Sequence, residues 1–244
     1  MTLKLDKDAV LGELEHFVQP AALLTTPDEV EANPPVPRLW QQFIDEQAQG
    51  RSLVLLTEWN DFAAELPSVQ DFLRTMLKGL CILREQDGTA SLLYLYTVGG
   101  SDVNFYRGRA PVTEVPQRLQ PVWNRIPAKL REFYTQLHDG WTFLPANSMG
   151  PLPLEDWAFL ADDKFDIDDE TARAMPIDIG KTVTVFHNGA GDYLCLHCAD
   201  DGVPEASGYI WWHEDPGNPE PVDFWGVLDA WVGIFLEEAD RHVA

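Results

Sequence analysis

Residues 183–236 read VTVFHNGAGDYLCLHCADDGVPEASGYIWWHEDPGNPEPVDFWGVLDAWVGIFL and decide the fold of the second half of the chain. β-Branched and aromatic residues flank the sequence Asn-Gly-Ala-Gly at 188–191, whose residues accept positive φ, and this predicts a β-hairpin. A polar turn at 200–202 and a third strand at 208–213 follow. Apolar residues then recur at helical spacing: Phe224, Leu228, Trp231, Val232, Phe235 and Leu236. The segment therefore predicts a β-meander closed by an amphipathic helix.

The rest of the chain predicts a mixture of helices and one further hairpin. Helical spacing of apolar residues predicts helices at about 6–18, 39–50, 62–79 and 127–138. The turn Asp87-Gly88 between two apolar runs predicts a hairpin over 80–98. Residues 19–37 are rich in proline and predict a connecting loop.

Residues 99–121 are rich in glycine, proline and arginine, which is typical of a domain boundary. We place that boundary near residue 111. An α/β N-terminal portion, either an extension or a subdomain, would then comprise residues 1–110, and a C-terminal domain would comprise residues 111–244.

The chain is strongly acidic. Its formal net charge is −23, of which −7 falls in residues 1–110 and −16 in residues 111–244. Such a field repels phosphate, so we expect neither nucleic acid nor an anionic membrane as a ligand and favour a basic protein partner. A surface that only keeps the protein soluble explains the acidity equally well.

Cysteine usage and the N-terminal sequence indicate the compartment. Three cysteines cannot form a disulfide framework, which agrees with a reducing environment. Acidic residues occupy the place where a signal peptide has its apolar region, and no apolar run approaches the roughly 20 residues that cross a bilayer. We therefore expect a cytoplasmic protein.

The C-terminal half carries a set of short motifs in a defined order. They are Ile126-Pro127, Leu130, Phe133-Tyr134, His138-Asp139-Gly140, the glycine-rich turn at 189–192, a tryptophan-bearing strand and a closing helix. In this order the chain resembles the SUKH superfamily over residues 112–240. One departure is Asp139-Gly140, where the superfamily more usually ends its entry helix with Asn-Gly; both Asp and Asn suit such a turn.

The resemblance implies an α+β domain, with an antiparallel-rich sheet flanked by helices, that binds proteins and has no catalytic role. The superfamily includes fungal cell-wall-synthesis regulators and many bacterial immunity proteins. We expect a bacterial immunity protein that masks the active site of a basic secreted toxin, for which a nuclease is one candidate. The alternative is an intracellular scaffold or regulatory protein of the same superfamily with no toxin partner.

Seven residues are candidates for contact with such a partner: Asp192, Trp211, Trp212, Glu214, Asp215, Asp223 and Trp225. Adjacent tryptophans on a strand point to opposite faces, so at least one of Trp211 and Trp212 belongs to the core, and packing of both against the final helix is equally compatible with the sequence. An exposed tryptophan among carboxylates would combine an aromatic anchor with acidic steering. Trp231 shares the apolar face of the final helix, whereas Trp225 lies off it.

Motifs for catalysis or metal binding are weak. Cys195 and Cys198 lie near histidines, but strand alternation sends the two thiols to opposite faces, and no second CxxC or HxxxH motif completes a zinc site. Neither a GxSxG motif nor a GxGxxG motif is present. We therefore expect no catalytic residues, no metal and no cofactor.

Overall fold

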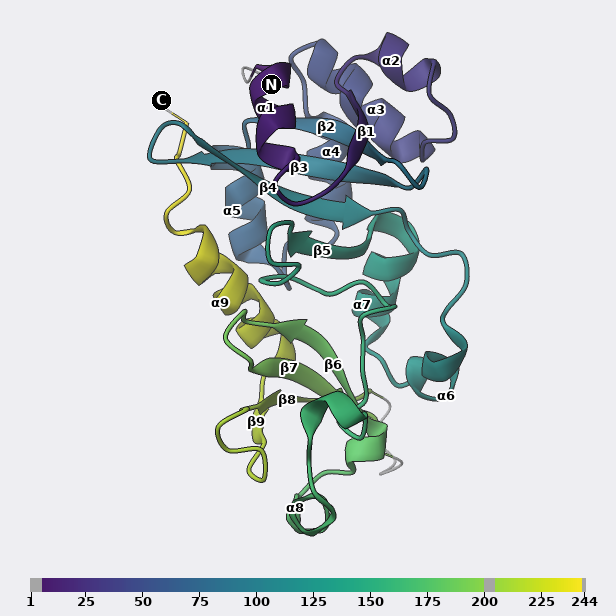
Figure 1. Ribbon diagram of the computed structural model, residues 1–244, viewed down its shortest axis with the longest axis vertical. Helices are drawn as coiled ribbons and strands as arrows, with labels where there is room; N and C mark the ends of the chain where they lie inside the picture. Colours follow the sequence, from purple (N-terminus) through teal and green to yellow (C-terminus); the bar gives the residue numbers. More distant parts are fainter. Residues whose placement is uncertain (1–5, 200–204, 243–244) are drawn as a thin grey trace. The chain divides into compact units, whose positions relative to one another are not determined.

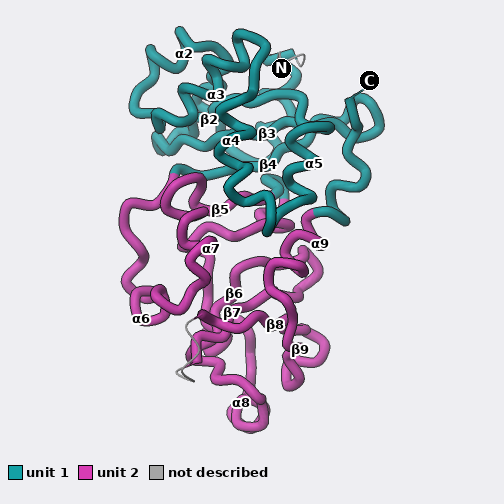
Figure 2. Tube along the Cα trace, turned by 180° about the vertical axis from the view of Figure 1, so that it is seen from behind, with its two compact units in different colours: residues 1–110, 143–145, 233–244 teal, residues 111–142, 146–232 magenta. Residues whose placement is uncertain are grey.

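The computed structural model describes residues 6–199 and 205–242, so the predicted turn at 200–202 lies outside the described residues. The chain forms two compact units (Figure 2). Unit 1 comprises residues 1–110, 143–145 and 233–244, and unit 2 comprises residues 111–142 and 146–232. The chain thus passes from unit 1 to unit 2 after residue 110, and the segment after residue 232 belongs to unit 1.

Unit 1 combines an antiparallel sheet with helices (Figure 1). Its helices are α1 (Lys7–Leu14), α2 (Pro27–Glu31), α3 (Arg38–Ala48), α4 (Leu53–Asn60) and α5 (Pro67–Thr75). Its strands are β1 (Pro20–Leu24), β2 (Gly79–Glu85), β3 (Ala90–Val98) and β4 (Asp102–Arg109), paired in that order. Directly after β5 (Asp139–Phe143), Leu144 donates its N–H to the carbonyl of Phe105 on β4.

Helices cover both faces of the unit 1 sheet (Figure 1). Alternation along the strands sends Cys81 and Leu83 to the face that packs on Val10 and Leu14 of α1. Tyr94 points to the opposite face, where its hydroxyl accepts a hydrogen bond from the indole of Trp59 on α4 (3.0 Å). Strands β2 and β3 are therefore buried on both faces, which explains why their sequences are almost continuously apolar.

Unit 2 contains a second antiparallel sheet. Its strands are β6 (Thr182–His187), β7 (Tyr193–His197), β8 (Ser207–Trp211) and β9 (Glu220–Val222), paired in that order. Its helices are α6 (Gln120–Trp123), α7 (Ala128–Glu132), which continues as a π-helical turn over Phe133–Leu137, and α8 (Asp169–Ala174). The closing helix α9 (Phe224–Leu236) begins in unit 2 and ends in unit 1. The α+β class and the meander closed by a helix are confirmed.

Different layers cover the two faces of the unit 2 sheet. On one face, Phe165 and residues 158–179 around it pack against Cys195 and Trp211. On the other face, Phe186 of β6 contacts Trp231 of α9, with 5.2 Å between ring centroids. The residues Phe224, Leu228, Val232 and Leu236 form the buried stripe of α9, while Trp231 is only half-buried.

The structure corrects several sequence predictions. The predicted loop at 19–37 contains β1 and α2, and the predicted boundary segment at 99–121 contains β4. Helix α2 forms because Thr26 and Glu29 make a capping box and Pro27 stands in its first turn, where a missing N–H costs nothing. Asp139 and Gly140 do not form a helix-ending turn; they begin β5, and the third strand of the meander ends at Trp211.

Candidate protein-binding surface

The turn between β6 and β7 is organised by one asparagine. The Asn188 side-chain oxygen accepts hydrogen bonds from the N–H groups of Ala190 (2.9 Å) and Asp192 (3.2 Å). Its amide nitrogen donates to the Asp192 carboxylate at 2.9 Å. Gly189 and Gly191 adopt φ values of 78° and 103°, a region in which a side chain would be strained. The turn is therefore a defined loop and not a flexible connection.

Asp192 joins this turn to the segment that follows β8. One of its carboxylate oxygens accepts hydrogen bonds from the backbone N–H of His213 (3.2 Å) and from its ring Nδ1 (2.8 Å). Burial of the carboxyl raises its pKa, but the hydrogen bonds from His213 and Asn188 outweigh this effect and hold the pKa of Asp192 below its ordinary value. The Asp192 carboxylate is thus ionised and committed to two neighbours inside the protein.

The segment held by Asp192 presents the exposed acidic residues. Trp212 is half-buried, and Glu214 and Asp215 are exposed. The Asp215 carboxylate accepts a hydrogen bond from the Asn218 side chain at 2.8 Å, which orders the loop between β8 and β9. We call residues 212–215 the acidic loop. It brings together one aromatic side chain and two exposed carboxylates.

Trp211, one of the candidate contact residues, is a core side chain and not a surface anchor. It is 5% exposed, and its ring packs against Phe165 (5.3 Å between centroids) and Tyr193 (6.1 Å). The ammonium of Lys164 lies over the Phe165 ring at 5.0 Å and over the Tyr193 ring at 5.6 Å. Burial lowers the pKa of Lys164, the nearby Asp162 carboxylate raises it, and the net shift is downward. The aromatic cluster therefore supports the base of the acidic loop from within.

Asp223 and Trp225 lie at the other end of the same strands. Val222 of β9 pairs with Gly208, the second residue of β8, whereas the acidic loop follows Trp211 at the last residue of β8. Three residues of extended strand separate these ends by about 10 Å. Asp223 is exposed and Trp225 is half-buried against Phe224. The seven candidate residues therefore form two groups, and Asp192 and Trp211 support the first group from beneath.

A second hydrogen-bonded loop lies beside the β6–β7 turn and was not predicted from the sequence. His187 accepts a hydrogen bond at Nδ1 from the N–H of Gly189, so its Nε2 carries the proton and donates to the carbonyl of Asn147 (3.2 Å). Burial lowers the pKa of His187 and keeps its ring neutral. Asn147 and Met149 both adopt positive φ, at 45° and 58°. Asn147 tolerates this conformation, but nothing in the local sequence signals it at Met149.

The cysteines lie away from this surface. All three are buried, and burial raises the pKa of each thiol, to about 12 at Cys198. Cys195 and Cys198 are 0% and 3% exposed, so both faces to which strand alternation would send their thiols are covered. Within residues 6–199 and 205–242, no three His, Cys, Asp or Glu side chains are placed to hold a metal ion. Across the same residues, no helix is long and apolar enough to cross a membrane.

Comparison with known proteins gives one match. Residues 114–230 match the model of the SMI1 / KNR4 family (SUKH-1), and this segment contains both groups of candidate contact residues. Comparisons with curated proteins and with solved structures gave no match. The α7 helix, the glycine-rich turn, the tryptophan-bearing strand and most of α9 all fall inside the matched segment. Residues 114–230 of this chain are therefore similar to the SUKH-1 family, which is consistent with a SUKH-superfamily segment.

Proposed function

We propose that unit 2 is an immunity module that binds a basic secreted toxin and neutralises it by masking the toxin's active site. The matched family supports the protein-binding part of this proposal. Unit 2 holds 21 acidic and 7 basic side chains, a net charge of −14 out of the total −23, and this negative charge supports a basic partner. A toxin that cleaves nucleic acid must be basic to engage phosphate, and an acidic inhibitor associates with it rapidly.

The main observation in favour of the proposal is that hydrogen bonds within unit 2 hold the acidic loop in place. Hydrogen bonds from His213 to Asp192 hold the start of the loop, and the Asn218 amide holds the Asp215 carboxylate. Glu214 and Asp215 are thereby presented from a preorganised backbone. A preorganised loop loses less conformational entropy on binding than a mobile one, so more of its contact energy appears as affinity.

We propose that the module acts by binding alone and in the cytoplasm. The buried thiols are poor nucleophiles, because burial raises their pKa far above neutral pH. The imidazole of His187 is occupied on both nitrogens by backbone groups. Neither side chain is therefore arranged for nucleophilic or acid–base chemistry at this surface.

The test measures the rate at which the purified full chain binds a secreted protein whose gene lies next to the gene of this chain. The measurement is made at low and at moderate salt. Double charge reversal, Glu214→Lys with Asp215→Lys, is expected to slow association by about tenfold or more at low salt and to reduce its salt dependence. The matched control is Glu114→Lys with Glu205→Lys, which changes two exposed carboxylates elsewhere in unit 2 by the same charge, Glu205 standing just before β8 at the end away from the acidic loop. This control is expected to stay within about threefold of the wild-type rate, because its charges act only at long range.

Equal effects of the two double variants would show that net charge and not the acidic loop governs association. In cells, co-expression of the chain is expected to rescue growth from the neighbouring secreted protein. If the chain does not bind that secreted protein but does bind a cellular protein, the result contradicts toxin neutralisation and favours the scaffold or regulatory alternative.

A further inference from the structure

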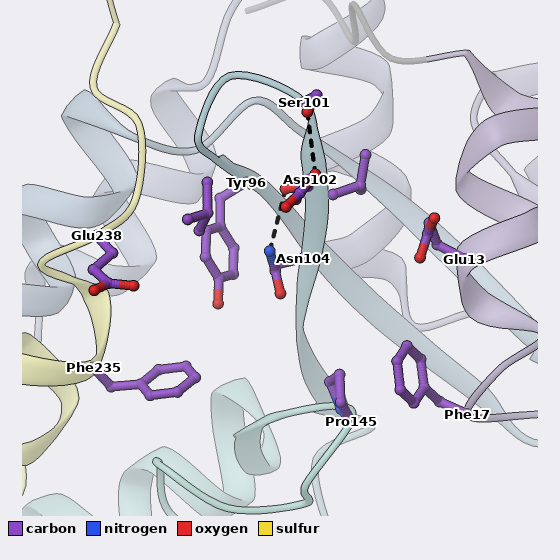
Figure 3. Close-up of a pocket in the computed structure, with 11 residues that line it drawn as sticks. Glu13, Phe17, Tyr96, Ser101, Asp102, Asn104, Pro145, Phe235 and Glu238 are labelled. Carbon is purple, nitrogen blue, oxygen red and sulfur yellow. Dashed lines mark hydrogen bonds between the residues drawn. The ribbon is translucent and has the colours of Figure 1, made fainter.

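A groove of about 480 Å³ lies in unit 1, and of its lining residues only Pro145 falls inside the segment that matches the SUKH-1 model (Figure 3). Its floor is the first half of β4, residues 102–104. Glu13 and Phe17, at and after the end of α1, stand on one side, and Phe235 and Glu238, at the end of α9, stand on the other. We call this feature the β4 groove.

Along the β4 groove, no backbone group of residues 6–199 or 205–242 pairs with the outer edge of β4 at Val103. Thr97 pairs with Val103 across the β3–β4 ladder, but the Thr97 carbonyl accepts its hydrogen bond from the N–H of Asp240 on the side away from β4. Thr97 and Val103 are therefore a non-hydrogen-bonded pair, and the Val103 N–H and carbonyl point away from β3. The carbonyl of Phe105, two residues on, points the same way and accepts from Leu144. Leu144, which directly follows β5, covers the edge of β4 at Phe105. Strand β5 ends at Phe143 and does not extend as far as Val103.

The side chains around this edge favour a cation. Glu13, Asp102 and Glu238 are all exposed, and each stands on a different element around the groove. The ring of Phe17 is 47% exposed and is therefore accessible to a ligand in the groove. A guanidinium or ammonium group that lies between a carboxylate and an aromatic face gains both ion-pair and cation–π attraction.

The hydroxyl of Tyr96, an otherwise buried side chain, lines the groove and has no hydrogen-bond partner among the described residues. Tyr96 is 2% exposed, and its ring packs edge-on against Phe72 (5.6 Å between centroids). Its hydroxyl end is directed toward the space between Phe235 and Asn104 (Figure 3). Burial raises the pKa of Tyr96, so the group is a neutral donor and acceptor. This hydroxyl is therefore available to donate or accept a hydrogen bond with a ligand in the groove.

We propose that the β4 groove binds an extended, basic segment of a partner protein by strand addition to β4. The segment would continue the line of β5 and exchange backbone hydrogen bonds with Val103. Its side chains would alternate between the α1 side and the α9 side, so that arginine or lysine residues meet carboxylates and aromatic rings on both sides. This site is separate from the acidic loop, and it does not depend on toxin neutralisation.

The test uses three peptides with blocked ends and the full chain labelled with ¹⁵N. The first peptide is Thr-Arg-Arg-Thr-Arg-Arg-Thr, which places arginines on both faces of a strand. The second peptide carries citrulline in place of arginine, and the third is the arginine peptide with an N-methyl group on every residue, so that neither of its edges can pair. We expect the first peptide to shift the amide signals of Val103 and Asn104. The citrulline peptide is expected to bind about tenfold more weakly because it lacks the positive charges, and the N-methylated peptide because it cannot pair with the β4 edge.

Two sets of variants locate the binding. The triple variant Glu13→Gln, Asp102→Asn and Glu238→Gln removes the negative charges of the groove. It is expected to lower the affinity for the arginine peptide by about tenfold. The control Glu31→Gln, Asp45→Asn and Asp61→Asn removes three exposed carboxylates of unit 1 outside the groove and is expected to change the affinity by less than about threefold.

Tyr96→Phe is expected to weaken peptide binding several-fold while the protein remains folded, because the hydroxyl makes no hydrogen bond within the described protein. The absence of shifts at Val103 and Asn104 at millimolar peptide would overturn the proposal. So would equal binding of the arginine and N-methylated peptides. If the chain forms a dimer and the groove variants dissociate it, the occupant of the β4 groove is a second copy of this chain and not a partner protein.

Discussion

Asp192 shows how a residue can matter to a binding surface without touching the partner. Its carboxylate holds His213 and Asn188, and only 9% of the residue is exposed. The pKa of Asp192 is lower in the folded protein than in the unfolded chain, so its stabilising effect is complete above its unfolded pKa of about 4. As the pH falls through the folded-state pKa, the carboxylate takes up a proton and that contribution is lost.

We predict that Asp192→Asn lowers the unfolding free energy of unit 2 by about 2 kcal/mol at neutral pH. The difference from wild type is expected to shrink as the pH falls below about 4, because the wild-type carboxyl then also becomes neutral. Denaturant titrations at several pH values measure this difference, with Glu114→Gln as the exposed control. A gap that stays constant from neutral pH down to strongly acidic pH would rule out the ionic contribution.

The sequence named candidate contact residues without separating the exposed side chains from the buried ones. An aspartate after a glycine-rich turn and a tryptophan beside another tryptophan both suit a surface. Burial of Asp192 and Trp211 depends on partners that lie far away in the sequence, His213 and Phe165. Strand alternation predicts that Trp211 and Trp212 face opposite sides, but it cannot tell which side another layer covers.

At the level of elements, β5 depends on two glycines that allow backbones to approach. Gly140 has φ of 79°, and a Cβ placed there would lie 2.4 Å from the backbone nitrogen of Pro153. Gly150 meets Trp141 in the same way, because a Cβ at residue 150 would lie 1.9 Å from the carbonyl oxygen of Trp141. The strand and the segment 150–153 are therefore in contact through their main chains, and any side chain would separate them.

We predict that Gly140→Ala destabilises unit 2 by about 3 kcal/mol, because it combines backbone strain with a clash that no side-chain rotation relieves. Gly189→Ala is the matched control. Gly189 has nearly the same φ, 78°, but its Cβ would meet only ordinary contacts with Ser148 and Met149. It is expected to cost about 1 kcal/mol. Equal losses in chemical denaturation would mean that the backbone approach at Gly140 contributes nothing.

Elements with local signals were predictable, and those without them were not. The Asp87-Gly88 turn between β2 and β3 is a feature of the sequence alone, and the hairpin predicted there is confirmed. The helix predicted over 62–79 is shorter in the structure, because α5 begins at Pro67 and ends at Thr75. Helix α2 was missed although its signal was present, because the capping box of Thr26 and Glu29 lies in a proline-rich stretch that was interpreted as a loop. Strand β4 was missed for a different reason. It alternates polar and apolar residues and ends in arginines, and only its pairing with β3 makes it a strand.

At the scale of the whole molecule, the end of the chain returns to unit 1. Phe235 of α9 packs on Phe143 (4.7 Å between ring centroids) and on Tyr106 (6.2 Å). Ala239 bridges to Val98, and the His242 N–H donates to the carbonyl of Thr75. No periodicity in the sequence connects these residues, so a boundary near residue 111 alone could not reveal that the final segment is part of unit 1's core.

We predict that Phe235→Ala lowers the stability of unit 1 by about 2 kcal/mol, less than the loss for a fully buried phenylalanine because Phe235 is half-buried. Amide hydrogen exchange is expected to accelerate in β3 and β4, which lie far away in the sequence, and much less in β6 and β7. The neighbouring change Ile234→Ala is the control, since Ile234 is 63% exposed and should alter neither region. Faster exchange confined to β6 and β7 would show instead that this part of α9 stabilises unit 2, and the assignment of residues 233–244 to unit 1 would then be wrong.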